Sequence, residues 1–418
     1  MIGAMRTVFK LGPYGLLMVI VALVSMSSVT AQDGLSVQPV ANPAAPGSAQ
    51  PQLTVSDRGV LLSWIERTGP TAALRFAERT SSGWTEPRTV ASGNDWFVNW
   101  ADVPSVIRLA DGSIYGHWLQ KSGPGTYAYD VRLARSTDDG RSFSSSFTPH
   151  HDGTQTEHGF ASLFQMPGAG LGLVWLDGRA MKSGSHDGHG GGGDMSVRSA
   201  VFDRSGKQAS EMPIDLRACE CCPTAVAVTS DGPIVAYRDR SPEEIRDIYI
   251  SRLIAGKWTT PAPVHKDNWK IAACPVNGPA LSADGKTVAI AWFTATGDAG
   301  HTYAAFSSDA GESFGRPIRL DDASALGRVD VQLLRDGSAI ATWIEFADGK
   351  AQFKMRRVQP SGQRGDATPV AGIGSGRSSG YPRMARFGDE LVFAWTETGD
   401  TARVRTATAR VAVASTAR

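Results

Sequence analysis

The four cysteines of this chain lie in two short segments that also carry charged side chains. They are Cys219, Cys221, Cys222 and Cys274. Thiolates combined with imidazole suit zinc or copper, and a glycine-rich segment with His186 and His189 is predicted to lie on the same face. In an exported protein the same thiols form disulfides, as a Cys221–Cys222 bond or a Cys222–Cys274 bond. Two disulfides, a zinc or copper site and a redox pair therefore stay open as alternatives.

Three carboxyl groups are candidates for acid–base chemistry. Asp102 ends a segment, Asn94–Asp102, in which amides and acids are interleaved with aromatic residues. Glu157 precedes a histidine, and Asp239 stands between two arginines. Two carboxyl groups that flank a glycosidic bond supply the acid and the base or nucleophile of a glycoside hydrolase. A hydrolase of this kind would use two of these three carboxyls, and the sequence leaves open whether catalysis occurs.

Aromatic, amide and basic residues of the predicted loops are candidates for ligand contact. Of the eleven tryptophans, six end a repeated strand pattern and two follow turns, which leaves three in loops. Those three either fill gaps between repeats or offer a stacking surface to a sugar ring. Arginines in such loops either brace neighbouring repeats or hold a carboxylate or phosphate with two hydrogen bonds. The candidates are Trp96, Asn99, Trp100, His158, Arg179, Arg238, Trp269, Lys270 and Arg328.

A repeat must position these groups. A short apolar strand that ends in an aromatic residue recurs seven times, with 51 to 62 residues between successive copies. A period of this size, built from short strands with glycine turns between them, predicts a propeller of four-stranded antiparallel blades. Seven repeats favour seven blades over the six of the alternative. The aromatic residues are Trp64, Trp118, Trp175, Tyr237, Trp292, Trp343 and Trp395.

The order of strands within a blade predicts where the ring closes and where function lies. The last repeat ends after its third strand, so we expect Leu35–Val40 to supply the fourth strand and close the ring. The candidate residues cluster in the loops between blades and in those between the second and third strands, and all these loops emerge on one face. Seven of the eight histidines also fall in or beside them. We therefore predict a ligand site in the mouth of this face.

Two turns carry the pattern S-x-D-x-G-x-S-F, at Ser136–Phe143 and Ser307–Phe314. The pattern resembles the Asp-box (BNR) repeat of sialidases and related propellers. Asp138 and Asp309 are expected to accept backbone N–H bonds inside the turn, while the glycine takes a positive φ. The two turns therefore predict the fold and are structural.

The resemblance to the sialidase superfamily implies a glycoside hydrolase with an arginine triad, an acid/base aspartate and a Tyr–Glu nucleophile. Arg179, Arg238 and Arg328 would then form the carboxylate clamp, and Tyr381 would pair with Glu157. The chain departs from the family because it lacks the Phe/Tyr-Arg-Ile-Pro motif and has seven repeats. The segments Cys-Glu-Cys-Cys, Tyr-Arg-Asp-Arg-Ser and Trp-Lys-Ile-Ala-Ala-Cys-Pro resemble exported bacterial proteins that are called sialidase-like.

The first 31 residues are predicted to be a signal peptide. Two basic residues precede an apolar run that is too short to span a bilayer, and Val29–Ala31 resembles a cleavage site. The remaining residues, 32–418, are predicted to form a single propeller domain in the periplasm or outside the cell, with no membrane span. A net charge of +1 and the lack of a basic run argue against nucleic acid as a partner.

Three functions are compatible with these patterns. The first is binding, with or without hydrolysis, of a carbohydrate or another small polar ligand in the mouth. The second is a metal- or redox-linked role of the cysteine and histidine cluster, with zinc or copper as the cofactor. The third is a binding scaffold without catalysis.

Overall fold

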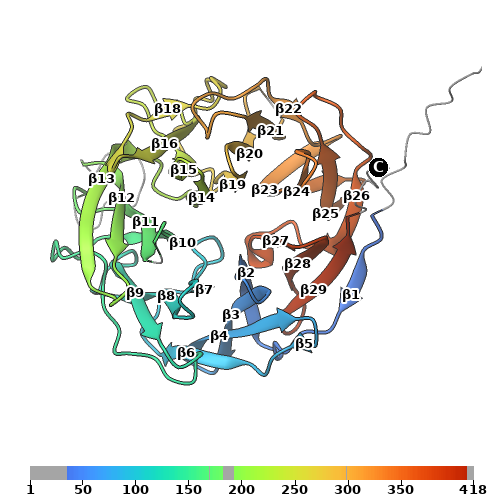
Figure 1. The fold of residues 1–418 in the computed structure, drawn as a ribbon. Coiled ribbons are helices and arrows are strands. Elements are labelled where there is room, and N and C mark those ends of the chain that lie inside the picture. Colours follow the sequence, from blue (N-terminus) through green and yellow to red (C-terminus); the bar gives the residue numbers. More distant parts are fainter. Residues whose placement is uncertain (1–34, 169, 182–192, 298, 412–418) are drawn as a thin grey trace, which may run out of the picture. The chain divides into compact units, whose positions relative to one another are not determined.

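The computed structural model describes residues 35–168, 170–181, 193–297 and 299–411, and these form seven β-sheets arranged around a central axis (Figure 1). Each sheet is one blade of a propeller, and its strands pair antiparallel in chain order from the axis outward. The prediction of seven four-stranded blades is confirmed, and the six-bladed alternative is wrong. No helix among these residues has the length and apolar character that crossing a membrane requires.

The first three blades have their innermost strands at Ser48, Ser105 and His158. Blade 1 comprises β2 (Ser48–Val55), β3 (Val60–Thr68), β4 (Thr71–Thr80), β5 (Gly83–Trp84) and β6 (Arg88–Gly93). Blade 2 comprises β7 (Ser105–Arg108), β8 (Ile114–Lys121) and β9 (Tyr129–Ser136), and a single bridge from Leu133 to Phe147 marks its outer edge. Blade 3 comprises β10 (His158–Gln165), β11 (Leu171–Asp177), β12 (Met195–Phe202) and β13 (Gln208–Ala218).

The next three blades repeat the arrangement. Blade 4 comprises β14 (Ala225–Thr229), β15 (Gly232–Arg238), β16 (Ile248–Ile254), β17 (Lys257–Trp258) and β18 (Ala262–Pro263). Blade 5 comprises β19 (Ala280–Asp284), β20 (Thr287–Thr294), β21 (His301–Ser307) and β22 (Ile318–Arg319). Blade 6 comprises β23 (Ser324–Leu333), β24 (Ala339–Ala347), β25 (Lys350–Val358) and β26 (Thr368–Ile373).

Blade 7 closes the ring with strands from both ends of the described chain. After the short 3-10 helix η1 (Arg377–Ser379) come β27 (Arg383–Phe387), β28 (Glu390–Glu397) and β29 (Arg403–Arg410). Its fourth strand is β1 (Gln38–Val40), which pairs with β29 so that Gln38 lies opposite Thr408. The predicted closure by the N-terminal segment is therefore confirmed. It removes the free edge that β29 would otherwise present.

The repeated aromatic residues hold neighbouring blades together. Each one lies in the second strand of its blade, as predicted. Trp175 of blade 3 packs against Tyr115 and Leu133 of blade 2, and Trp292 of blade 5 packs against Ile234 of blade 4. Both indoles are fully buried, and burial of so large an apolar surface is a main stabilising term between two sheets. The repeated aromatic side chains thus pack each blade against its neighbour.

The two S-x-D-x-G-x-S-F turns have the same hydrogen bonds. In the first, Asp138 Oδ1 accepts from Ser142 N at 3.0 Å, and Ser136 Oγ accepts from Gly140 N at 2.8 Å. Gly140 has φ +78°, and a Cβ there would meet the Phe76 ring at 2.6 Å. The turns connect third and fourth strands, so they lie on the face opposite the loops between blades. They have the structural role that the sequence predicts.

Candidate functional site

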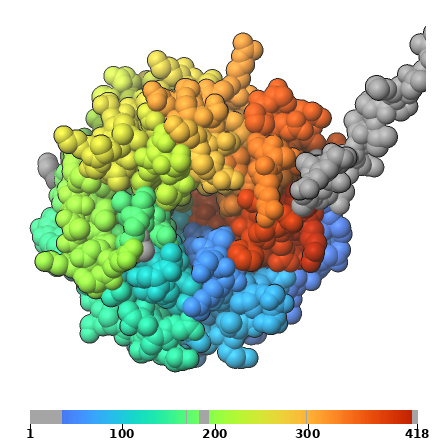
Figure 2. Space-filling view, viewed as in Figure 1, coloured from blue at the N-terminus to red at the C-terminus, as the bar shows by residue number. Residues whose placement is uncertain are grey.

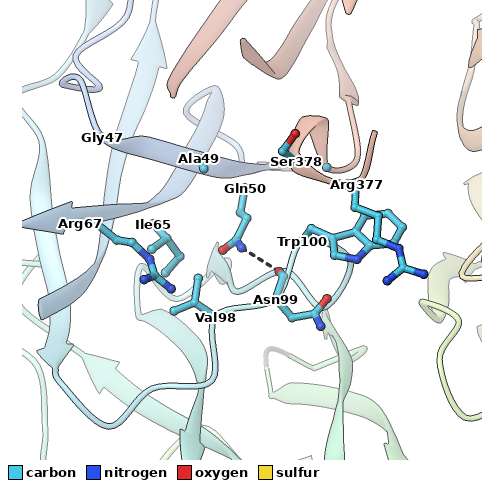
Figure 3. Close-up of a pocket in the computed structure, with 11 residues that line it drawn as sticks. Gly47, Ala49, Gln50, Ile65, Arg67, Val98, Asn99, Trp100, Arg377 and Ser378 are labelled. Carbon is cyan, nitrogen blue, oxygen red and sulfur yellow. Dashed lines mark hydrogen bonds between the residues drawn. The ribbon is translucent and has the colours of Figure 1, made fainter. Parts of the chain in front are cut away.

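We call the face that carries the loops between blades the upper face. A pocket of about 380 Å³ opens there between blades 1, 2 and 7 (Figure 3). Its walls come from the loop that precedes β2, the end of β3, the loop between blades 1 and 2, and η1. Figure 2 shows that the centre of the ring is hollowed. The lining residues are Gly47, Ala49, Gln50, Ile65, Arg67, Val98, Asn99, Trp100, Arg377, Ser378 and Gly380.

Two contacts hold the Trp100 ring in place, one with an aromatic ring and one with a guanidinium group. Its ring stacks on Tyr381, with 6.0 Å between ring centroids and 21° between planes. The Arg328 guanidinium lies 4.8 Å from its centroid. Arg328 in turn donates to Ser379 Oγ at 2.7 Å and to the Gly380 carbonyl at 2.9 Å. The indole, which is partly exposed in the pocket, is therefore pre-organised for stacking.

Gln50 and Asn99 give the pocket oriented amide groups. Gln50 Nε2 donates to the Asn99 carbonyl at 2.7 Å, and the buried Gln50 Oε1 has no hydrogen-bond partner among the described residues. Asn99 Oδ1 accepts from Ala101 N at 2.9 Å, which leaves its Nδ2 as a donor. Gln50 has φ +57° at a bulge of β2. Bulges and left-handed non-glycine residues occur often at binding sites, where they redirect a side chain.

The pocket is positively charged. Arg67 and Arg377 are exposed, and neither has an ion pair among the described residues. In the view of Figure 3 they stand at opposite ends of the pocket, with Gln50, Asn99 and Trp100 between them. None of the eleven lining residues is acidic or a histidine. The pocket can hold an anionic or polar ligand, but it contains no group suited to acid–base catalysis near neutral pH.

Two of the three predicted catalytic carboxyls do meet, but below the surface. Tyr129 donates to Glu157 Oε1 at 2.5 Å and lies 3.2 Å from Asp102 Oδ2. Asp102 is 1% exposed and Glu157 4%, so no substrate bond can lie between them. Burial, reinforced by the charge of Glu157, raises the pKa of Asp102 to about 8. The expected hydrolase pair is therefore a buried acid pair that shares a tyrosine.

Asp239 lies apart from that pair, where blade 4 meets blade 3. It is half-buried, and its N–H donates to the Asp247 carbonyl at 2.9 Å. Burial and the nearby Asp215 carboxylate raise its pKa to about 7. Asp215 itself accepts from the Tyr237 hydroxyl. Asp239 does not line the pocket of the upper face.

The three arginines of the predicted carboxylate clamp do not converge. Arg179 pairs with Asp177 and Glu211 in blade 3. Arg238 is 1% exposed, and its guanidinium donates to three backbone carbonyls, among them those of Asn277 and Phe293. Arg328 donates to the segment around η1, as described above. Arg238 and Arg328 reach the next blade or the loop before it, whereas Arg179 pairs within blade 3, so the structure does not bring the three guanidinium groups together.

Tyr381 is not a partner of Glu157. Its hydroxyl donates to the Val276 carbonyl at 2.6 Å, and burial raises its pKa. The tyrosine beside Glu157 is Tyr129, which lies at the start of β9. The Tyr–Glu pair implied by the sialidase resemblance therefore involves a different and buried tyrosine.

The remaining tryptophan and lysine candidates divide between core and surface. Trp269 is 6% exposed and packs in the core between blades 5 and 6, with the Arg238 guanidinium 4.9 Å from its ring. The Trp269 ring therefore fills the space between two blades and offers no face to a ligand. Trp96 is partly exposed and stacks on the repeat residue Trp118 at 5.4 Å. Lys270 is exposed and lies outside the pocket.

The cysteines gather as predicted, but no disulfide is present among the four. Cys219 Sγ lies 3.2 Å from Cys222 Sγ and 3.9 Å from Cys221 Sγ, and all four thiols are free. The thiols of Cys221 and Cys274 also interact. Arg246 donates to Cys219 Sγ at 3.2 Å, and the thiols and this guanidinium hold the pKa of Cys219 well below its usual range. Cys219 and Cys222 are the nearest pair, which differs from both predicted pairings. His186 and His189 lie outside the described residues.

Sequence reasoning missed most of the residues that form the pocket. It named Asn99 and Trp100, but Gln50, Arg67 and Arg377 stand in segments without a motif. It also missed Asp130, which lies beside His158. A signal for Arg67 was its place near the end of β3, the strand that carries Trp64, where that strand reaches the upper face. Arg377, in a Gly- and Ser-rich loop, gave none.

No protein-family model and no curated protein matches this sequence. Among solved structures, a protein of unknown function from Dyadobacter fermentans is similar, with a TM-score of 0.54 and 13% identity over 91% of this chain and all of that one. The polysaccharide lyase Uly1 has a TM-score of 0.52 and 12% identity, over 89% of this chain and 91% of that one. The NanB sialidase of Streptococcus pneumoniae has a TM-score of 0.49 and 8% identity, over 90% and 94%. At these identities the likeness shows the propeller fold alone.

Proposed function

We propose that this protein binds an acidic carbohydrate in the pocket of the upper face, without cleaving it there. The observation that carries the proposal is the combination of a fixed indole with two unpaired guanidinium groups. Trp100 offers a ring face to a sugar, and Arg67 and Arg377 offer two forks to carboxylate or sulfate groups. The amides of Gln50 and Asn99 supply hydrogen bonds for hydroxyl groups.

Binding without cleavage follows from the placement of the carboxyl groups. Most glycoside hydrolases use two carboxyls that flank the scissile bond, and sialidases use a tyrosine nucleophile. Asp102 and Glu157 are buried, Asp239 lies elsewhere, and the pocket has no acidic lining residue. The name of the similarly folded Uly1, a polysaccharide lyase, agrees with a glycan ligand, but the proposal rests on the pocket itself. We place this function in the periplasm or outside the cell, after removal of residues 1–31.

The test is calorimetric titration with oligosaccharides of equal length, one built of hexuronic acids and one of neutral hexoses. We expect the acidic oligomer to bind and the neutral one to bind at least about tenfold more weakly, because only the former pairs with both arginines. Arg377→Ala and Trp100→Ala should each weaken binding by a similar factor. Arg377 is exposed, so its replacement leaves the fold intact.

Arg316→Ala is the matched control, because this arginine is also exposed but follows the turn on the opposite face. It should leave binding unchanged. Equal binding by the wild type and the Arg377 and Trp100 variants would refute the site. Shortening of the oligomer, followed by mass spectrometry, would refute the absence of cleavage.

A further inference from the structure

A second polar cluster lies between blades 2 and 3, outside the glycan pocket. The bridge between Tyr129 and Glu157 is parallel, so the residues that follow them, Asp130 and His158, lie side by side. The connection between the two blades adds His150 and Asp152. Two imidazoles and two carboxylates thus meet at one blade interface. We call these four residues the His–Asp cluster.

The two imidazoles stack face to face between the two carboxylates. Their ring centroids are 3.8 Å apart, and the planes differ by 7°. On one edge Asp130 Oδ1 lies 3.9 Å from His150 Nε2 and 3.6 Å from His158 Nδ1. On the other edge Asp152 Oδ2 lies 3.2 Å from His150 Nδ1 and 3.3 Å from His158 Nε2.

At these distances several nitrogen and oxygen atoms of the His–Asp cluster still lack a hydrogen bond. Five atoms of the cluster are buried and have no hydrogen bond within the described residues. The His158 side chain is fully buried, His150 is 5% exposed and Asp152 9%. Buried polar atoms without a partner are rare and cost free energy, so five that face one another need an explanation. The atoms are Asp130 Oδ1, His150 Nε2, His158 Nδ1, His158 Nε2 and Asp152 Oδ2.

The carboxylates of the His–Asp cluster have few cationic partners, which favours binding of a cation. Asp177 is already saturated, because Arg179 and the Trp175 Nε1 donate to it. Arg179 reaches Asp152 only at 3.5 Å, and within the described part of the chain Asp130 has ion pairs with the two imidazoles and no others. A neutral imidazole is the form that binds a metal.

We propose that Asp130 Oδ1, His150 Nε2 and His158 Nδ1 bind one divalent transition-metal ion of the zinc type. The interacting atoms of these three residues all lie within 4.8 Å of one another. Two histidines and one carboxylate are an established donor set for such ions. Ligands of a tetrahedral zinc lie about 3.3 Å apart, and the rings must turn out of their parallel stack for both nitrogens to face one ion. Asp130 is 22% exposed, which leaves a fourth position for water.

Asp152 has the complementary role of holding the rings. It faces the ring nitrogens that do not point to Asp130, and metal-bound histidines commonly donate their second N–H to a carboxylate. Thr154 fixes Asp152 by donating its N–H to Oδ1 at 3.0 Å. The ion would join β9 of blade 2, β10 of blade 3 and the connection between them.

The experiment is a titration of the chelator-treated full-length protein with Zn²⁺ by calorimetry and with Co²⁺ by visible absorption. The cysteine cluster is a separate source of binding, so the triple variant C219S/C221S/C222S is titrated in parallel. We expect this variant to retain one tight equivalent of zinc. Asp130→Asn and His158→Gln should each weaken that equivalent at least about tenfold, because each removes one ligand.

His151→Gln is the matched control, because His151 is the exposed neighbour of a ligand and its ring bonds to Gln208 Oε1 at 3.3 Å, away from the cluster. Its zinc affinity should equal that of the wild type. Zinc should raise the Tm of the triple cysteine variant and fail to raise it once Asp130→Asn is added to that variant. The Tm of the two proteins without zinc shows whether Asp130→Asn, at a side chain that is 22% exposed, leaves the fold intact. No zinc binding to the triple cysteine variant, or unchanged binding after Asp130→Asn, would overturn the proposal and leave His158 as a proton-charged partner of the two carboxylates.

Discussion

Replacing Asp102 with asparagine should change how the stability of this protein depends on pH. The carboxyl is 1% exposed, accepts from Phe160 N at 2.7 Å and lies 3.2 Å from the Tyr129 hydroxyl oxygen. Burial beside Glu157 raises its pKa from 3.8 to about 8. Between these two values the unfolded chain releases the proton and the folded protein keeps it. The contribution of Asp102 to the free energy of unfolding is therefore greatest below pH 3.8, and it is lost as the pH rises towards 8.

The size of this effect follows from the two pKa values. At about 1.4 kcal/mol for each pKa unit, the difference corresponds to roughly 6 kcal/mol as an upper limit, because a coupled pair shares its titration. Asparagine has the shape and the donor–acceptor pattern of the protonated acid. Near pH 4 the variant should thus unfold with nearly the wild-type free energy. Above pH 8 it should be more stable than the wild type by several kcal/mol.

Urea unfolding, followed by tryptophan fluorescence across this pH range, measures the difference directly. Comparison of the variant with the wild type cancels the titration of all other groups. Asp389→Asn is the control, because that carboxylate is exposed and has no side-chain hydrogen bond in the described structure. A difference between Asp102→Asn and wild type that does not vary with pH would refute the reasoning.

Three further predictions concern the ring. Glu78→Leu should destabilise the protein in urea unfolding by less than the roughly 3–5 kcal/mol of a buried charge left without a partner, because it removes the bidentate partner of Arg108 but leaves Asp139 at 2.8 Å; an unchanged stability would contradict this. Replacing Gln38–Val40 with a Gly-Ser-Gly segment should lower Tm and cause concentration-dependent association in sedimentation, because β29 then has a free edge; a monomer with unchanged Tm would argue against closure by β1. Asp309→Ala should lower Tm by only a few degrees and leave glycan binding intact, because its bonds stay within one exposed turn; lost binding would show a functional role.

The candidate site shows where reasoning from sequence succeeds. Trp100 and Asn99 could be predicted because the periodic tryptophans are assigned to blades first, and those that remain must lie in loops. The same argument failed for Trp269, since a loop residue of a propeller can turn inward and fill the gap between two sheets. Elimination identifies the segment but does not show which way a side chain points.

The carboxyl and arginine candidates show a related limit. Asp102 and Glu157 meet, but the parallel bridge between Tyr129 and Glu157 draws them under the surface, and this pairing has no sequence signature. Arg238 looked like a ligand group. It instead donates to the Arg246 carbonyl of its own blade and to the Asn277 and Phe293 carbonyls, which only the packed ring brings within reach.

The sequence by itself determined the number of blades, the strand order, the aromatic packing and the closure by β1, because each follows from local patterns that repeat at a fixed period. Tertiary structure alone decided which polar groups meet. Gln50, Arg67 and Arg377 join one pocket from blades 1 and 7, and Asp130 joins His150 and His158 across blades 2 and 3. The physical reason is that ring closure and blade packing, rather than any local motif, set the distances between residues so far apart in the chain.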